Sequence, residues 1–254
     1  MITGKQRELQ QRDELFLRVA QDLLLEDGYH GLTMARVADM TRFSKGTVYN
    51  RFSCKEEIVV ELGSQCRELR YTMLERAAHY HGRPRERMVA LGEAAEHFER
   101  LYPEKMRVLS IIDAEAILEK VPEELRKHIK SFEIRAFNLA VGVVHDAIAE
   151  GDLVLPARSS APELSFALWC VFDSGAASLI SGFPYSETGM DDPYGAIARG
   201  CHLLMDGAGW RPLTAEWDYS ATARHIRDTL FAEEARLLSE LEAQQRAGQR
   251  ELSA

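Results

Sequence analysis

The twelve residues from Thr41 to Phe52, TRFSKGTVYNRF, carry the side chains best suited to chemistry in this chain. Ser44 is a natural N-cap, because its side-chain oxygen can accept hydrogen bonds from the free amides of a first helical turn. Polar groups of the kind that contact phosphates and base edges follow at Lys45, Thr47, Tyr49 and Asn50. Val48 and Phe52 lie four residues apart and share the opposite face. The run therefore predicts the turn and second helix of a helix-turn-helix.

Helical patterns upstream would hold this run in place. Residues 9–27 carry an apolar stripe at helical spacing, and Gly28 is well placed to end that helix. A short helix from Met34 to Met40 and a turn from Thr41 to Phe43 then precede the third helix, Ser44 to Phe52. We expect these three helices to form one small unit.

Downstream, Ser53 and Glu56 match a capping box that begins a long helix ending near Tyr80. Strand signals are almost absent from the remaining residues, where Gly, Pro and Ser separate helical stretches. We expect further helices over residues 84–102, 103–120, 122–150, 162–181, 193–207 and 220–247. The sequence therefore predicts an all-α fold.

The composition, 46% hydrophobic and 28% charged, is that of an ordinary soluble protein. The chain has no apolar run long enough to cross a bilayer and no signal-peptide core at its N-terminus, so we expect no membrane partner and a cytoplasmic location. The four cysteines are not spaced as zinc ligands or a redox pair: Cys54, Cys66, Cys170 and Cys201. We expect scattered buried thiols and neither a metal site nor a cofactor, with metal or redox sensing by one of the cysteines as the alternative.

The net charge of −9 is unusual for a protein that binds nucleic acid, but its distribution matters more than its total. Residues 1–60 contain nine Lys or Arg and nine Asp or Glu, so the remaining residues carry all of the excess negative charge. Four basic residues fall within fourteen positions of one another: Arg42, Lys45, Arg51 and Lys55. An acidic body behind a basic tip would help to orient that tip toward DNA.

The first fifty-odd residues resemble the tetracycline-repressor-like (TetR/AcrR) transcriptional regulators. The matching motifs agree in order and spacing: Gly28-Tyr29, Leu32-Thr33-Met34, Val37-Ala38, Ser44 to Tyr49, Phe52 and Lys55-Glu56. The resemblance implies a three-helix helix-turn-helix domain over residues 1–56, followed by a larger helical ligand-binding and dimerisation domain over residues 57–254. This chain departs from the family pattern at Arg42, because the family turn usually carries glycine there. We therefore expect either a positive φ at Arg42 or a slightly different turn.

The resemblance also implies how double-stranded DNA would be held. Phosphate contacts fall to Lys45, Thr47 and Tyr49, with flanking contacts from Thr33 and Lys55. We expect a further phosphate contact from Arg42, where the turn departs from the family pattern. Base reading falls to Ala35, Gly46, Asn50, Arg36 and Arg51.

Members of this family act as homodimers, and two short recognition helices about one helical turn of DNA (~34–36 Å) apart can read a palindrome. Small residues on the helix from Leu164 to Ser181 permit close helix approach, and with the helix from Tyr194 to Met205 they suggest half of a symmetric four-helix bundle. The residues expected at this interface are Ala167, Ser174, Gly175, Ser178, Ile197, Cys201 and Leu204. Packing of the small residues within one subunit is the alternative.

The resemblance further implies an unidentified small-molecule effector bound among the middle helices. Side chains that could line its cavity are His97, Phe98, Met106, Phe137, Asn138, Trp169 and Phe172. Ordinary core packing remains open for each of them. We expect an apolar or aromatic ligand with one polar head, which shifts the dimer to a state that does not fit DNA.

Two other classes of protein remain as alternatives. An enzyme is disfavoured, since the sequence has no phosphate-binding glycine loop, no GxSxG and no HExxH, and no catalytic residue is assigned. A helical interaction or sensor protein that keeps the fold without binding DNA is left open by the near-neutral N-terminal segment and by Arg42. The sequence thus favours a ligand-responsive regulator, with repression chosen by analogy.

Overall fold

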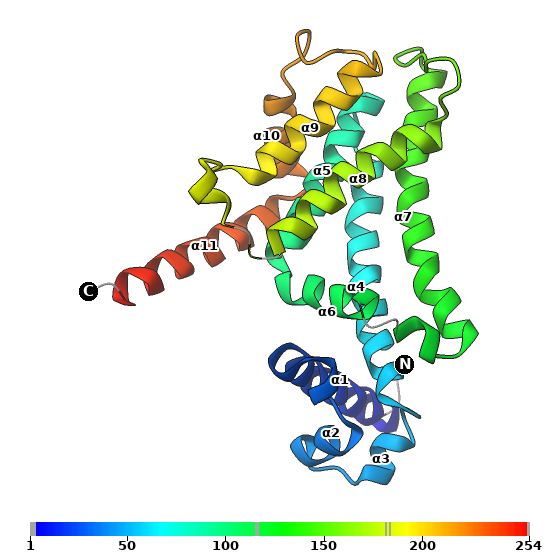
Figure 1. Cartoon of the computed structure of the whole chain (residues 1–254), viewed down its shortest axis with the longest axis vertical. Helices are drawn as coiled ribbons and strands as arrows, with labels where there is room; N and C mark the ends of the chain where they lie inside the picture. Colours follow the sequence, from blue (N-terminus) through cyan, green and yellow to red (C-terminus); the bar gives the residue numbers. More distant parts are fainter. Residues whose placement is uncertain (1–3, 115–116, 181, 183, 253–254) are drawn as a thin grey trace. The chain divides into compact units, whose positions relative to one another are not determined.

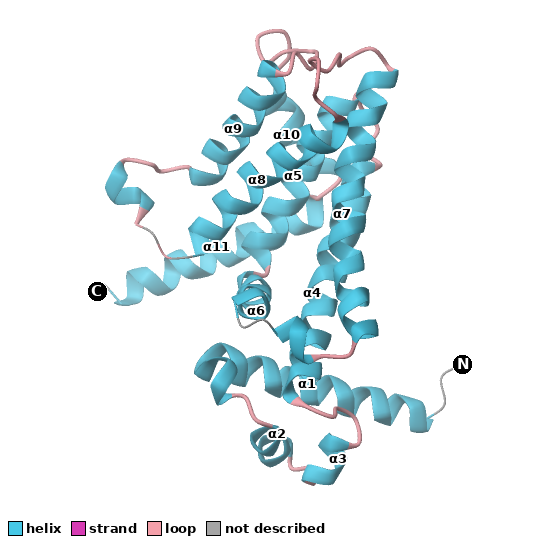
Figure 2. Cartoon of the chain, turned by 45° about the vertical axis from the view of Figure 1, so that its right-hand side comes forward, coloured by secondary structure: helices cyan, strands magenta, loops and turns pink. Residues whose placement is uncertain are grey.

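This computed structural model describes residues 4–114, 117–180, 182 and 184–252. The regular secondary structure of these residues is entirely helical (Figure 1). Figure 2 shows helix and loop colours alone over these residues. The all-α prediction is confirmed. The helices divide into two compact units, and each unit is described by itself.

The first unit comprises residues 1–69 and 104–133. It contains α1 (Gly4–Gly31), α2 (Met34–Thr41), α3 (Lys45–Tyr49), the start of α4 (Lys55–Ala78), α6 (Pro103–Ala114), a 3-10 turn (Ile117–Lys120) and the start of α7 (Glu123–Ala149). These boundaries do not follow the predicted division at residue 56. Apolar side chains from α6 and α7 join the core of the helix-turn-helix segment, so the contacts of that segment extend well beyond it.

The core of the first unit explains why these short helices are stable. Nearly fully buried side chains come from every helix of the unit: Phe16, Leu24, Val37, Val48, Phe52, Ile58, Val108, Ile112 and Ile129. Each such side chain contributes roughly 1.5–3 kcal/mol by leaving water. Helices as short as α2 and α3 are marginal alone, so this burial, and not intrinsic propensity, fixes their positions.

The ends of several helices bear out local sequence signals. Gly28 leaves the helical conformation inside α1, with φ 71° and ψ −176°, where the sequence predicted a helix end. The predicted capping box is wrong in one partner: the Ser53 amide donates to Glu57 at 2.7 Å, not to Glu56. Glu56 instead accepts a hydrogen bond from the Tyr29 hydroxyl, which lies far away in the sequence.

The second unit comprises residues 70–103 and 134–254. It contains the end of α4, α5 (Pro84–Leu101), the end of α7, α8 (Ala161–Ile180), a 3-10 turn (Tyr185–Thr188), α9 (Pro193–Gly207), α10 (Tyr219–Thr229) and α11 (Ala232–Leu252). α8 packs on α9, and α5 packs on both α10 and α11. None of the helices in the described residues is long and apolar enough to cross a membrane.

The helix predicted over residues 220–247 is wrong in its continuity, because the chain breaks between α10 and α11 at Leu230 and Phe231. Both amides donate to the Ile226 carbonyl, which ends α10. The break buries the Phe231 side chain completely and stacks its ring on His97 at 5.5 Å. An amphipathic pattern alone does not reveal such a break, since the apolar period continues through it.

A buried guanidinium fixes the connector between α9 and α10. Arg85 is fully buried, donates to the Pro212 carbonyl at 2.8 Å and to Asp206 at 2.6 Å, and also hydrogen-bonds the Trp210 carbonyl. The Trp210 side chain is fully buried as well. The guanidinium charge of Arg85 is tolerated at 0% exposure because several hydrogen-bond acceptors surround it.

Candidate nucleic-acid interface and ligand cavity

The turn between α2 and α3 has the geometry of a helix-turn-helix. Thr33 caps α2 by accepting from the Arg36 amide at 3.2 Å, and Ser44 caps α3 by accepting from the Thr47 amide at 3.1 Å. Arg42 adopts φ 60° and ψ 24° between them, and the amides of Arg42 and Phe43 donate back to α2 carbonyls. Of the two alternatives expected at Arg42, the positive φ is the one present.

One side of α3 anchors the helix and the other is open. Val48 is completely buried, whereas Lys45, Gly46 and Asn50 are exposed and the Tyr49 side chain is 53% exposed. Within the described residues, the side chains of Lys45, Tyr49 and Asn50 make no hydrogen bond or ion pair, and neither does that of Arg42. A polar helix face that its own protein leaves unsatisfied is suited to a polar partner such as DNA.

Three other basic candidates are engaged within the unit. Arg36 pairs with Asp27 at 2.6 Å and donates to the Gly31 carbonyl. Arg51 pairs with Asp13 at 2.6 Å. Lys55 donates to the Tyr29 carbonyl at 2.8 Å and lies 3.8 Å from the centre of the Tyr29 ring. These contacts were not visible in sequence, because the partners of Arg51 and Lys55 lie 38 and 26 positions away.

The remaining DNA-site candidates lie on the same segment. Thr33 is exposed and Ala35 is half-buried. Thr47 is half-buried, and its hydroxyl lies 2.8 Å from that of Ser44. The side chains that remain both exposed and unpaired are therefore those of the turn and of α3.

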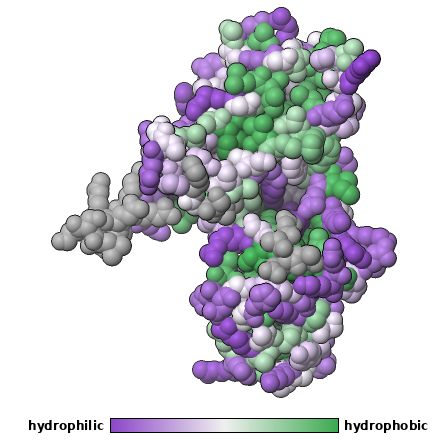
Figure 3. All heavy atoms as spheres, viewed as in Figure 1, coloured by the Kyte–Doolittle hydropathy of each residue, from purple (hydrophilic) through white to green (hydrophobic). Residues whose placement is uncertain are grey.

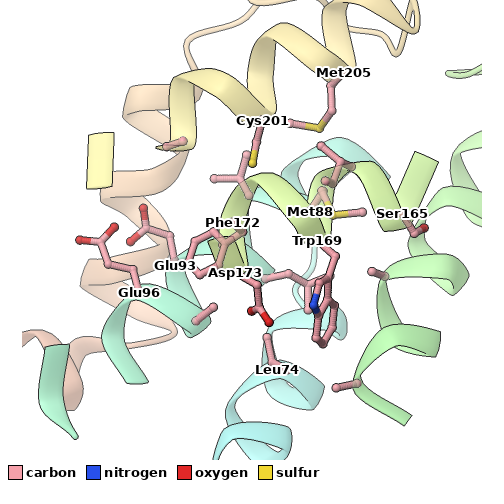
Figure 4. A pocket seen from close by; sticks show the side chains of 18 of the residues that line it. Leu74, Met88, Glu93, Glu96, Ser165, Trp169, Phe172, Asp173, Cys201 and Met205 are labelled. Carbon is pink, nitrogen blue, oxygen red and sulfur yellow. The ribbon is translucent and has the colours of Figure 1, made fainter. Parts of the chain in front are cut away.

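A cavity of about 150 Å³ lies in the second unit among α4, α5, α7, α8, α9 and α10 (Figure 4). Its apolar wall includes Leu74, Met88, Leu91, Leu168, Trp169, Phe172 and Met205. Engineered cavities of this size hold one benzene ring. The cavity is therefore large enough for a small aromatic or aliphatic group.

The structure brings together two of the predicted ligand residues, Trp169 and Phe172, at this cavity. Phe137 packs against Trp169 with ring centres 6.0 Å apart, but it does not line the cavity. His97 and Phe98 are buried in the core of the second unit, Asn138 is exposed, and Met106 packs on the core of the first unit. The position of the effector site stays a prediction.

Charged side chains at the cavity were missed by the sequence analysis. Glu93, Glu96, Asp173 and Arg70 line it. Asp173 had a visible signal, since it is the lone charged residue between Glu163 and Asp191 apart from Glu187 in the following loop. Glu93 had none, because acidic residues are frequent along α5.

Burial changes the acidity of two groups in the wall. Burial raises the pKa of Glu93 to about 7, although Arg227 opposes the rise. Burial also lowers the pKa of His202 to about 4, and the nearby Arg85 adds to this effect. His202 is therefore neutral at pH 7, while Glu93 keeps part of its population protonated.

The predicted dimer residues lie on the paired helices α8 and α9. Gly175 packs so closely on Ile197 that a Cβ on the glycine would lie 2.6 Å from Cγ1 of Ile197. This contact lies within one chain, as the alternative interpretation of the small residues requires. The others are exposed or half-buried: Ala167, Ser174, Ser178, Cys201 and Leu204.

Apolar side chains are also present on the surface of α8 and α9. Figure 3 shows hydrophobic residues gathered on one face over this part of the second unit. Phe166 on α8 is 61% exposed and Leu203 on α9 is 73% exposed. Large exposed apolar side chains of this kind mark interaction surfaces when they are grouped.

Residues 16–62 match the family model of the bacterial regulatory proteins of the tetR family. Solved structures with the same fold include a tetR-family regulatory protein from Rhodococcus RHA1, with TM-score 0.60 and 16% identity over 78% of this chain and 97% of that one. The TetR-family regulator PfmR from Thermus thermophilus has TM-score 0.57 and 16% identity over 75% and 97%. A putative transcriptional regulator from Saccharomonospora viridis, solved in complex with choline, has TM-score 0.61 and 17% identity over 78% and 96%. No curated protein matches this chain.

Proposed function

We propose that this chain, whose N-terminal domain belongs to the tetR family, binds a palindromic DNA operator as a homodimer and is released from it by a small molecule. The supporting observation is the open polar face of α3. Lys45, Tyr49 and Asn50 are exposed and unpaired among the described residues, while Val48 anchors the helix from behind. Repression is the mode that we propose for the regulator.

The proposed DNA contacts come from α3, the turn before it and the starts of α2 and α4. Lys45, Thr47 and Tyr49 contact phosphates from α3, and Arg42 adds a phosphate contact from the turn. Asn50 and the bare backbone of Gly46 face the bases. Thr33 and Lys55 supply flanking phosphate contacts.

Ala35, Arg36 and Arg51 complete the proposed base-reading set. The side chains of Arg36 and Arg51 each hold an ion pair of 2.6 Å, with Asp27 and Asp13 respectively. Reaching a base would require each arginine to leave its carboxylate. We therefore assign them a smaller share of the specificity than Asn50.

The homodimer forms through α8 and α9 in this proposal. Phe166 and Leu203 give the pair an exposed apolar surface, and Gly175 on Ile197 fixes the two helices against each other. Two copies of the pair would make a four-helix bundle. Size-exclusion chromatography with light scattering tests this directly, with Leu203→Glu as the disrupting variant and Leu9→Glu, an exposed apolar residue of α1, as the control.

The effector site is the cavity of the second unit. The similar structure from Saccharomonospora viridis holds choline, which supports small-molecule binding by this fold. Binding would favour a dimer whose recognition helices have the wrong separation for DNA.

A gel-shift titration against the DNA that flanks the gene tests operator binding. We expect Lys45→Glu combined with Tyr49→Phe to abolish the shift and Lys127→Glu, on an exposed part of α7, to leave it nearly unchanged. A helical interaction protein without DNA binding is the second candidate, favoured by the ion pairs that occupy Arg36 and Arg51. The absence of any shift at low salt, where nonspecific phosphate contacts persist, would decide for it.

A further inference from the structure

We propose that the cavity of the second unit binds a small organic cation with an apolar body, and that the free carboxylate oxygen of Glu93 is its counter-charge. This inference rests on the proposed effector site and names the chemistry of its ligand. It follows from the charges, the unsatisfied atoms and the aromatic rings of the cavity wall (Figure 4).

The charge of the wall favours a cation. Three carboxylates line the cavity, from Glu93, Glu96 and Asp173, against the single guanidinium of Arg70. Arg70 is already engaged, since it donates to Asp173 at 2.7 Å. The imidazole of His202 adds no charge at neutral pH, because its pKa is lowered by burial. An anionic ligand would therefore meet three carboxylates on the wall, while the one guanidinium that lines it is already paired with Asp173.

Glu93 offers the unsatisfied group that a cation requires. Its side chain is 9% exposed, and Oε1 accepts from Arg227 at 2.7 Å. Oε2 is buried and accepts no hydrogen bond within the described residues. His97 lies 3.9 Å from Oε2, but burial lowers the pKa of this histidine and keeps it neutral. A buried carboxylate oxygen without a partner is costly unless a ligand satisfies it.

A second polar atom and two aromatic rings complete the site. The Ser165 hydroxyl is fully buried at the cavity wall and has no partner among the described residues. Trp169 already holds one cation, since the Arg70 guanidinium lies 5.6 Å from its ring centre. Phe172 lines the same cavity, and aromatic faces attract organic cations. These groups would hold the apolar body and orient the charged head.

Binding should also release protons. Burial holds part of the Glu93 population protonated at pH 7, since the pKa of this carboxyl is about 7. The charged groups facing it are Arg227 on α10 and Glu96 and Arg100 on α5. A bound cation favours the charged carboxylate, so each binding event displaces part of a proton. A neutral ligand would displace none.

The test uses three probes with the same phenylpropyl body and different heads: 3-phenylpropylamine, 3-phenyl-1-propanol and 3-phenylpropionate. Titration calorimetry on the full chain at pH 8, without DNA, measures each affinity. We expect the protonated amine to bind about tenfold or more tightly than the alcohol, equivalent to ~1.4 kcal/mol, and the carboxylate to bind weakest. Equal binding of amine and alcohol, or no binding of the amine, would overturn the proposal.

Matched variants locate the charge. Glu93→Gln should abolish the preference for the amine over the alcohol, whereas Glu150→Gln, at an exposed acid in the turn directly after α7, should preserve it. Arg227→Met removes the competing guanidinium and also raises the pKa of Glu93, because Arg227 lowers it. More of Glu93 is then protonated at pH 8, so amine binding to this variant should release more protons than binding to the wild type. Should Glu93→Gln fail to fold, Arg227→Met still decides, since an unchanged or smaller proton release contradicts the assignment.

Proton release and DNA release give two further measurements. Calorimetry of the amine at pH 7 in two buffers with different ionisation heats should report a net proton release that Glu93→Gln removes. If the amine binds but does not release DNA in the gel shift, the proposed regulation fails while the cation site stands. If none of the probes binds but a cell extract still releases DNA, the cation site fails and the proposed function stands.

Discussion

Replacing Arg42 with glycine separates two effects that the structure combines at this residue. Arg42 has φ 60°, a region where a side chain costs roughly 1–2 kcal/mol that glycine does not incur. Glycine in turn lowers the free energy of unfolding by roughly 0.5–1 kcal/mol, because it gives the unfolded chain more conformational freedom. Arg42→Gly should therefore stabilise the protein by about 0.5–1 kcal/mol, which corresponds to a rise in Tm of roughly 2–4 °C per kcal/mol for a protein of this size.

The same substitution should weaken DNA binding. Arg42 is exposed and lies in the turn before α3, so our proposal assigns it one phosphate contact. Losing one contact per subunit should make the negative slope of log affinity against log salt less steep by about 0.9 per subunit. A salt series of gel shifts or anisotropy titrations measures this slope, and thermal denaturation measures the stability.

Two controls separate strain from charge. Arg158 is the other non-glycine residue with positive φ in the described part of the chain, at 72°, and it is exposed in the second unit. Arg158→Gly should raise Tm by a similar amount and leave the salt slope unchanged. Arg42→Ala should lower the slope without the gain in stability. An unchanged slope in Arg42→Gly would refute the phosphate contact, and an equal gain in Arg42→Ala would refute the backbone strain.

Two further predictions concern the second unit. Gly175→Ala places a Cβ 2.6 Å from Ile197 and should destabilise the α8–α9 pair by ~1–3 kcal/mol. Gly142→Ala on α7, with open space around the new Cβ, should instead stabilise the protein by up to about 1 kcal/mol. Urea denaturation compares the two variants, and equal effects would contradict the close contact. Burial raises the pKa of Glu99 to about 8, with Arg70, Asp173, Glu96 and Tyr194 as its charged or polar neighbours. The folded protein then keeps a proton that the unfolded chain loses above its ordinary pKa near 4.5, so this group's contribution to stability falls as the pH rises from about 4.5 through 8. The glutamine of Glu99→Gln does not ionise, so the free energy of unfolding of this variant relative to the wild type should rise between pH 5.5 and about 8. A constant difference in the free energy of unfolding across that range would contradict the assignment.

Local signals were enough to predict the helix-turn-helix. The caps at Thr33 and Ser44, the apolar anchor Val48 and the positive φ at Arg42, one of two alternatives expected there, each depend on residues within a few positions. Interactions of that range are encoded in short sequence windows. For the same reason, the exposed face of α3 could be anticipated before any tertiary contact was known.

Long-range pairs could not be predicted in this way. The partner of Arg51 is Asp13, and the partner of Glu93 is Arg227, 134 positions away. Charged residues at helical spacing have many possible partners in a sequence with 31 Lys or Arg and 40 Asp or Glu residues. Only the packing of the helices selects among them, and that packing decides which basic side chains remain free for DNA.

The break after α10 shows how one unpredicted turn affects the cavity. Because the chain turns at Leu230, Phe231 stacks on His97, and His97 is buried away from the cavity lining. The same arrangement sets α10 against α5, so that Ala223 lines the cavity and Arg227 reaches Glu93. Ala223, which had no predicted role, is therefore the α10 residue that lines the cavity. In the proposed cation site, α10 therefore supplies the counter-ion of Glu93, and truncation before Tyr219 would remove that counter-ion.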